Sequence, residues 1–195
     1  MRLALLAAAL LLAGCVGPAE PHFDHTPAST TPAPSAPSPA PYAGQEMREI
    51  KALSTEEIEG YRAGAGLGYA LPAELNSYPG PLHALEMGER LQLTAEQRDA
   101  LTSLRADMLA AAVPLGERYL VIESAIEQGF RDGALDEPSL RSLLDESALV
   151  EAELRYTHLS THLATKALLT THQVALYDEA RGYGRADHAS HEHES

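Results

Sequence analysis

Residues 93–131 read LTAEQRDALTSLRADMLAAAVPLGERYLVIESAIEQGFR, and this stretch decides the fold class of the chain. Thr94 stands three residues before Gln97, which is the spacing of a capping box. In such a box each side chain accepts a hydrogen bond from the backbone N–H of the other residue. Apolar residues then recur at steps of three and four as far as Phe130, which predicts one amphipathic helix of about 55 Å. Pro114 lies inside the helix and predicts a kink near residues 110–113.

A second long helix is predicted immediately after the first. Asp132-Gly133 ends the first helix, and Asp136 followed by Pro138 begins another that runs to about Ala167. Its buried side is expected to carry Leu140, Leu143, Leu144, Val150, Leu154 and Leu163. The sequence therefore predicts an all-α fold built on a long, kinked antiparallel helical hairpin.

Shorter helices are predicted on both sides of the hairpin. One begins at Ser54 or Thr55 and ends near Arg62, and another runs from Leu82 to about Leu91 after a Pro- and Gly-containing turn. Between them, residues 64–68 are rich in glycine and predict a flexible connection.

A second capping box begins the last predicted helix. Leu169, Thr170 and Gln173 repeat the spacing of Leu93, Thr94 and Gln97, and the helix is expected to end before residue 182. Two long helices share too little surface to be stable alone. We therefore expect the hairpin to form a cradle-like or intertwined homodimer.

The first residues predict export and lipid anchoring. Arg2 precedes the apolar run 3–13, which is too short to span a bilayer and is typical of a signal peptide. The run ends in Leu12-Ala13-Gly14-Cys15, which resembles the lipobox of bacterial lipoproteins. We expect Cys15 to be acylated and to anchor the chain to a membrane. An ordinary signal peptide with a chance cysteine is the alternative. Val16 favours the outer membrane over the inner one, by resemblance to the sorting rule of such lipoproteins.

Composition divides the chain into four parts. The signal peptide occupies residues 1–14, and the lipidated cysteine with a Pro/Ala/Ser-rich disordered linker occupies 15–45. The helical domain covers 46–183, and a His-rich disordered tail covers 184–195. The 28 acidic and 14 basic residues give a net charge of −14, and no basic cluster occurs. Nucleic acid is therefore not an expected partner.

The two Leu-Thr-x-x-Gln motifs resemble those of the Spy/CpxP superfamily of envelope proteins. The resemblance covers about residues 54–183, and segments 78–86 and 155–163 look like its periplasmic heavy-metal sensor branch. It implies a helical, often dimeric periplasmic protein without enzymatic activity. It also implies a role in metal sensing or resistance, or in the envelope stress response. The cationic chaperone cradles of this superfamily differ from the present acidic chain.

Two histidines on the second long helix are the best candidates for metal ligands. His158 and His162 stand four residues apart, so they share one face of the helix. His83, on the short helix before the hairpin, is the candidate third ligand, with Glu86 or Met87 beside it. Carboxylate would suit zinc, nickel or cobalt, and thioether would suit copper. The alternative is that His158 is a buried core residue and His162 a solvated one.

Two functions follow as hypotheses. The first is an envelope lipoprotein that binds a divalent heavy metal and passes a signal to a membrane partner. The second is an ATP-independent periplasmic chaperone that holds unfolded clients on the apolar inner face of the hairpin. The sequence contains no HExxH motif and no nucleophile elbow, and acylation would remove the thiol of its one cysteine. Enzymatic activity is therefore not predicted.

Overall fold

The computed structural model describes residues 40–183, and these form a helical domain without strands. The predicted signal peptide, Cys15, most of the predicted linker and the His-rich tail lie outside the described residues. In chain order the helices are α1 (Thr55–Arg62), α2 (Leu71–Glu74), α3 (Pro81–Glu86), α4 (Ala95–Arg131), α5 (Glu137–Leu168) and α6 (Thr171–Arg181). The all-α prediction is confirmed. None of these helices is both long and apolar enough to cross a bilayer.

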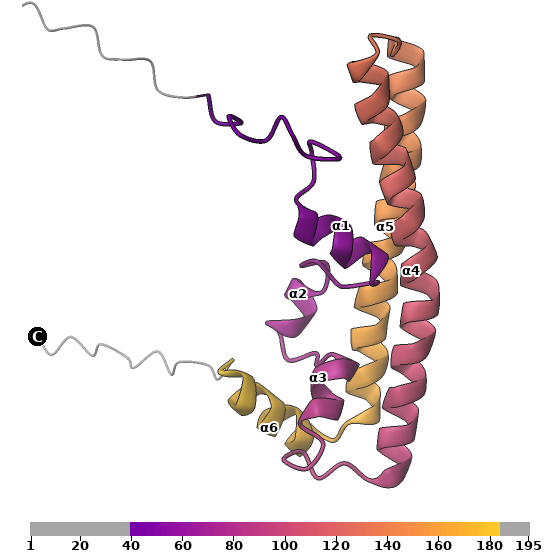
Figure 1. The fold of residues 1–195 in the computed structure, drawn as a ribbon. Helices are drawn as coiled ribbons and strands as arrows, with labels where there is room; N and C mark the ends of the chain where they lie inside the picture. Colours follow the sequence, from indigo (N-terminus) through magenta and orange to yellow (C-terminus); the bar gives the residue numbers. More distant parts are fainter. Residues whose placement is uncertain (1–39, 184–195) are drawn as a thin grey trace, which may run out of the picture. The chain divides into compact units, whose positions relative to one another are not determined.

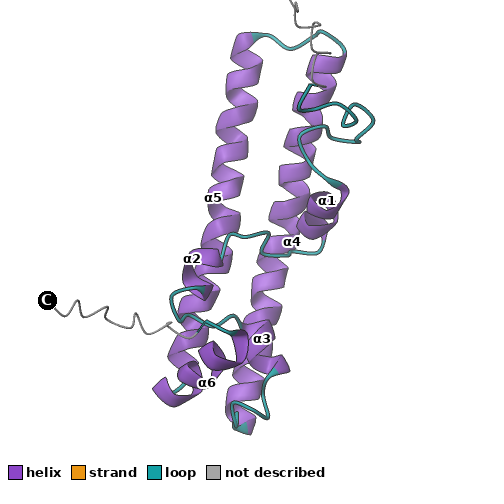
Figure 2. Ribbon diagram, turned by 90° about the vertical axis from the view of Figure 1, so that its left-hand side faces the viewer, coloured by secondary structure: helices purple, strands orange, loops and turns teal. Residues whose placement is uncertain are grey.

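Helices α4 and α5 form the predicted antiparallel hairpin, and the shorter helices all lie on one face of it (Figure 1; Figure 2). The capping box at Thr94 is present, because its hydroxyl accepts from Gln97 N–H at 3.2 Å and Gln97 Oε1 accepts from Thr94 N–H at 3.1 Å. Asp136 begins α5 by accepting from Ser139 N–H at 2.9 Å. Helix α4 continues through Pro114 without interruption. The predicted kink and the predicted homodimer stay predictions.

The two Leu-Thr-x-x-Gln motifs meet at the open end of the hairpin. Gln97 and Gln173 form a reciprocal pair of amide hydrogen bonds, each 2.9 Å long. Each amide nitrogen also donates to a backbone carbonyl, of Leu168 for Gln97 and of Leu91 for Gln173. Each amide oxygen accepts from the N–H of the capping threonine in its own motif. The pair is therefore fully hydrogen-bonded, and it joins the start of α4 to the start of α6.

Two separate hydrophobic cores stabilise the domain. The first, here called the α1 core, packs α1 and the segment before it against the middle of the hairpin; it contains Ile50, Leu53, Ile58, Tyr61, Ala112, Leu120, Ile122, Val150 and Leu154. The second, here called the α6 core, packs α3 and α6 against the open end of the hairpin; it contains Ala84, Leu91, Leu93, Leu101, Leu169, Val174 and Tyr177.

A glycine allows the close approach of α1 to α4. Gly116 is buried within α4, and a Cβ built there would collide with the backbone carbonyl of Tyr61. Only a residue without a side chain lets the end of α1 pack directly on the long helix.

Several residues predicted to be buried are exposed. Phe130 is 65% exposed, Leu144 46% and Leu163 60%. The first two lie near the closed end of the hairpin, beyond α1, where none of the other described helices packs on α4 and α5 (Figure 1). Leu163 lies on a face of α5 away from the buried residues His158, Thr161 and Thr165. The short helix predicted from Leu82 to about Leu91 also differs, since α3 ends at Glu86 and residues 87–92 form turns.

Candidate functional site

A cavity of about 530 Å³ opens between the hairpin and the short helices. Along α4 it is lined by Arg105, Met108 and Leu109, which stand between Leu101 of the α6 core and Ala112 of the α1 core. The loop after α1, the start of α3 and the end of α6 contribute the other walls. The cavity is therefore the gap that remains where the two cores do not meet.

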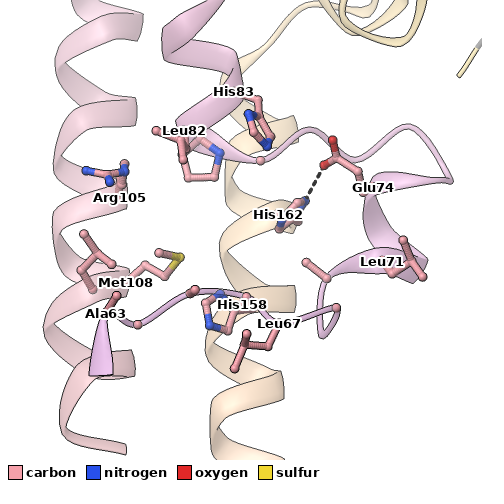
Figure 3. Close-up of a pocket in the computed structure, with 18 of the residues that line it drawn as sticks. Ala63, Leu67, Leu71, Glu74, Leu82, His83, Arg105, Met108, His158 and His162 are labelled. Carbon is pink, nitrogen blue, oxygen red and sulfur yellow. Dashed lines mark ion pairs between the residues drawn. The ribbon is translucent and has the colours of Figure 1, made fainter. Parts of the chain in front are cut away.

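Two of the predicted metal ligands form the α5 wall of this cavity. His158 and His162 are buried, with 4% and 9% of their surfaces exposed, and they follow one another by one helical turn. Figure 3 shows both rings on α5, with His162 beneath the segment that leads into α3 and His158 beside the loop that follows α1. The prediction that the two imidazoles share a face is confirmed by their common place in the cavity wall.

The ring of His162 is held in one orientation. Its Nδ1 lies 2.7 Å from the backbone carbonyl oxygen of Tyr78. A carbonyl oxygen only accepts, so Nδ1 carries the proton and Nε2 of the neutral ring has a free lone pair. Gly80 lies against this side of the ring, because a Cβ there would be 3.2 Å from Nε2. A metal-binding histidine usually donates its other ring N–H to a carbonyl or carboxylate in this manner.

The ring of His158 has no hydrogen-bond partner among the described residues. Its Nε2 is buried and unpaired, which is a costly state for a polar atom. Burial, and secondarily the neighbouring His162, lower the pKa of His158 below its usual value. The ring is therefore neutral near pH 7, as a metal ligand must be. Tyr69 stacks on it, with ring centroids 6.2 Å apart.

A buried carboxylate, Glu74, connects His162 to the last helix. Glu74 is 8% exposed, and its Oε2 lies 3.7 Å from His162 Nδ1 (dashed line in Figure 3). Its Oε1 accepts a hydrogen bond from the Tyr177 hydroxyl and lies 3.4 Å from Arg181 Nε. Burial, and then the hydrogen bond to Glu74, raise the pKa of Tyr177. The cluster joins α2, α5 and α6 around the rim of the cavity.

Sequence reasoning did not single out Glu74 or Tyr177 for this cluster. Glu74 belongs to α2, a helix of a single turn. The only sequence signal for this helix is Pro72 near its start. Glu74 and Tyr177 stand 103 residues apart, so no local pattern pairs them. The start signal of α6 was the one available clue, since it places Tyr177 on the same face as Gln173 and Val174.

The remaining predicted ligands lie less favourably. His83 lines the cavity, but its side chain is 38% exposed and its Nδ1 lies 2.9 Å from Glu86 Oε2. The Glu86 side chain is 58% exposed and does not line the cavity. Met87 packs against the α6 core, and the thioether in the cavity wall belongs to Met108.

The structure therefore brings the three predicted histidines to one cavity without completing a ligand set. Among residues 40–183, no three His, Cys, Asp or Glu side chains are grouped closely enough to hold one metal ion. The pair on α5 is a partial donor set. The ring of His162 is oriented through its Nδ1, and Nε2 of His158 is a buried nitrogen without a partner among the described residues.

Comparison of the chain with protein-family models, with curated proteins and with solved structures finds no match in any of the three. The resemblance to the Spy/CpxP superfamily stays a hypothesis that rests on the two Leu-Thr-x-x-Gln motifs and on segments 78–86 and 155–163.

Proposed function

We propose that this protein is an envelope lipoprotein that binds a divalent heavy-metal ion through His158 and His162, in metal sensing or resistance. The observation that carries the proposal is the buried Nε2 of His158, which has no hydrogen-bond partner within residues 40–183 and lies one helical turn from His162. Zinc, nickel, cobalt and copper all accept imidazole ligands. Anchoring through Cys15 and residence in the periplasm, at the outer membrane, are parts of the same proposal.

Metal binding at this place has a route to a structural signal. His162 contacts the carbonyl of Tyr78 and the carboxylate of Glu74, which in turn accepts from Tyr177 on α6. A ligand that binds one arrangement of these elements better shifts the population towards it. A metal on the α5 pair would thus bias the packing of α2, α3 and α6. A membrane partner would bind the face of the hairpin that carries α2, α3 and α6, and would respond to this change in their packing.

A calorimetric titration of the full-length chain with Zn²⁺ tests the proposal. The parent is compared with a His158→Ala/His162→Ala variant and with a His172→Ala control, since His172 is an exposed residue in the first turn of α6. The other histidines of the chain contribute equally to all three proteins, so the difference isolates the pair. We expect the double variant to lose one zinc equivalent per chain and the control to lose none. Equal isotherms for parent and double variant, both folded by circular dichroism, would contradict the proposal.

A second candidate function, ATP-independent chaperone activity, is favoured by exposed apolar residues on α5. Leu149, Tyr156 and Leu163 stand seven residues apart and are 70%, 68% and 60% exposed. Residues at this spacing form one stripe along a helix, and this stripe faces away from the buried Val150 and Leu154. The short helices cover the inner face at the middle and the open end of the hairpin. In this candidate function, clients would therefore bind the outer stripe.

An aggregation assay separates the chaperone candidate from metal binding. The protein would suppress aggregation of a denatured model protein in the presence of a chelator, and a Leu149→Ser/Tyr156→Ser/Leu163→Ser variant would not. Val121→Ser is the matched control, because Val121 is 67% exposed on α4, outside the stripe. No suppression by the parent at several-fold molar excess would eliminate this candidate.

A further inference from the structure

The α5 histidine pair leaves a bound metal with an incomplete coordination shell. Zinc in proteins takes four ligands, and nickel and cobalt take up to six. The cavity wall offers the two imidazoles of α5, and no group of three suitable side chains occurs in the described part of the chain. At least two coordination positions must therefore be filled by something other than the protein.

The cavity is much larger than an ion needs. Its volume of about 530 Å³ lies in the range of pockets that hold small organic ligands. Leu67, Leu71, Leu82 and Met108 line it, so much of its wall is apolar and poorly suited to holding a hydrated ion. The space and its lining fit a small organic molecule better than a shell of water.

An arginine stands across this space from the histidines. Figure 3 shows Arg105 on α4 and the histidine pair on α5, on opposite sides of the cavity. With the residues that the structure describes, Arg105 forms no ion pair, although the chain has a net charge of −14. The other arginine of the lining, Arg181, is already paired with Glu74. A guanidinium with free donors is well suited to a carboxylate, which it binds through two parallel hydrogen bonds.

We propose that the cavity takes its metal as a complex with a small amino-carboxylate chelator, bound between the α5 histidines and Arg105. This inference rests on the proposed metal function and names its ligand class. His158 and His162 provide imidazole nitrogens to the metal, and the chelator fills the other coordination positions. Arg105 binds the carboxylate of the chelator, and the apolar wall packs on its carbon skeleton.

Two chelators that differ only in a carboxylate provide the test. Nickel is presented to the full-length protein alone, as its L-histidine complex, or as its histamine complex, and the three affinities are measured by calorimetry. Both chelators have the same amine and imidazole donors, but histamine lacks the carboxylate. We expect the L-histidine complex to bind the parent about tenfold more tightly than the histamine complex, as a hydrogen-bonded charged group contributes.

The Arg105→Gln variant completes the cycle. It should remove the preference for the carboxylate-bearing complex, so that the L-histidine and histamine complexes bind this variant with equal affinity. Arg98→Gln is the matched control, since Arg98 lies on the same helix outside the cavity lining and should leave the preference intact.

The outcomes separate this inference from the proposed function. An L-histidine complex that binds no better than nickel alone or than the histamine complex would overturn the inference, as would an Arg105→Gln variant that keeps the preference. In either case, nickel binding that still depends on His158 and His162 would leave the metal function standing. If none of the three forms of nickel binds in a way that depends on His158 and His162, both the inference and the proposed metal function are overturned.

Discussion

The two ends of the hairpin differ in how they are stabilised. At the open end, α3 and α6 pack on α4 and α5, and the amides of Gln97 and Gln173 are fully paired. At the closed end no other helix among residues 40–183 packs on α4 and α5, and Phe130 and Leu144 are exposed. The apolar residues that recur along α4 and α5 are thus packed in a core at the open end and exposed to solvent at the closed end. The histidine cavity lies between the α6 core and the α1 core, where neither core fills the space.

The largest effect should come from truncating a leucine of the α6 core. Leu101 is fully buried, and Leu101→Ala removes its packing and leaves a cavity. We expect the free energy of unfolding to fall by about 3 kcal/mol, against less than about 0.5 kcal/mol for Leu144→Ala near the closed end. Urea denaturation followed by circular dichroism measures both. Equal losses would show that the two ends do not differ as described.

A smaller loss is expected where α1 crosses α4. Gly116→Ala places a methyl group against the backbone of Tyr61, so α1 must move. The free energy of unfolding should fall by about 2 kcal/mol, even though alanine is the better helix former. Gly129→Ala is the control in the same helix, because the atoms nearest to its new Cβ belong to the side chain of Leu135 near the closed end. A Gly116→Ala variant as stable as the parent would show that α1 does not pack this closely.

The glutamine pair should contribute less than either packing site. Gln173→Ala leaves the amide of Gln97 and the carbonyl of Leu91 without their partner, which should cost about 1–2 kcal/mol. Gln128→Ala removes an exposed amide near the closed end and should change stability by less than about 0.5 kcal/mol. Thermal unfolding of the two variants compares the ends directly. A smaller effect at Gln173 than at Gln128 would contradict the paired arrangement.

The pH dependence of stability should reflect the protonation of His158, which lines the cavity between the two cores. The pKa of His158 is lowered in the folded state, so the unfolded chain binds the proton more readily. The stability contribution of the neutral ring is present above the unfolded pKa of about 6.5 and is lost as the pH falls below it. His158→Gln should therefore flatten the fall in stability between pH 7 and pH 5. A slope that His158→Gln leaves unchanged would show that the ring already carries a proton or a partner.

The sequence predicts what is local in this fold. The capping boxes at Thr94 and Thr170 are confirmed because each needs only residues three positions apart. His158 and His162 share a wall because helical geometry alone places residues four apart on one face. The long hairpin follows from the period of its apolar residues and from the break at Asp132-Gly133.

What the sequence does not predict depends on contacts between distant segments. Gln97 and Gln173 are 76 residues apart, and neither motif alone predicts that the two side chains form hydrogen bonds with each other. Burial of Glu74 depends on Tyr177 and Arg181, which belong to another helix. Periodicity identified Leu144 and Leu163 as apolar positions, but it does not tell which part of a helix a neighbour covers.

The most direct test of the central claim observes the imidazole nitrogens themselves. Long-range ¹H–¹⁵N spectra of the full-length protein, with histidine signals assigned through His158→Gln, His162→Gln and His172→Gln, are recorded before and after one equivalent of Zn²⁺. We predict that the ring nitrogens of His158 and His162 shift and that Nδ1 of His162 stays protonated against the carbonyl of Tyr78. The signals of His172 should stay in place. Shifts confined to histidines other than this pair would contradict a metal site in the cavity.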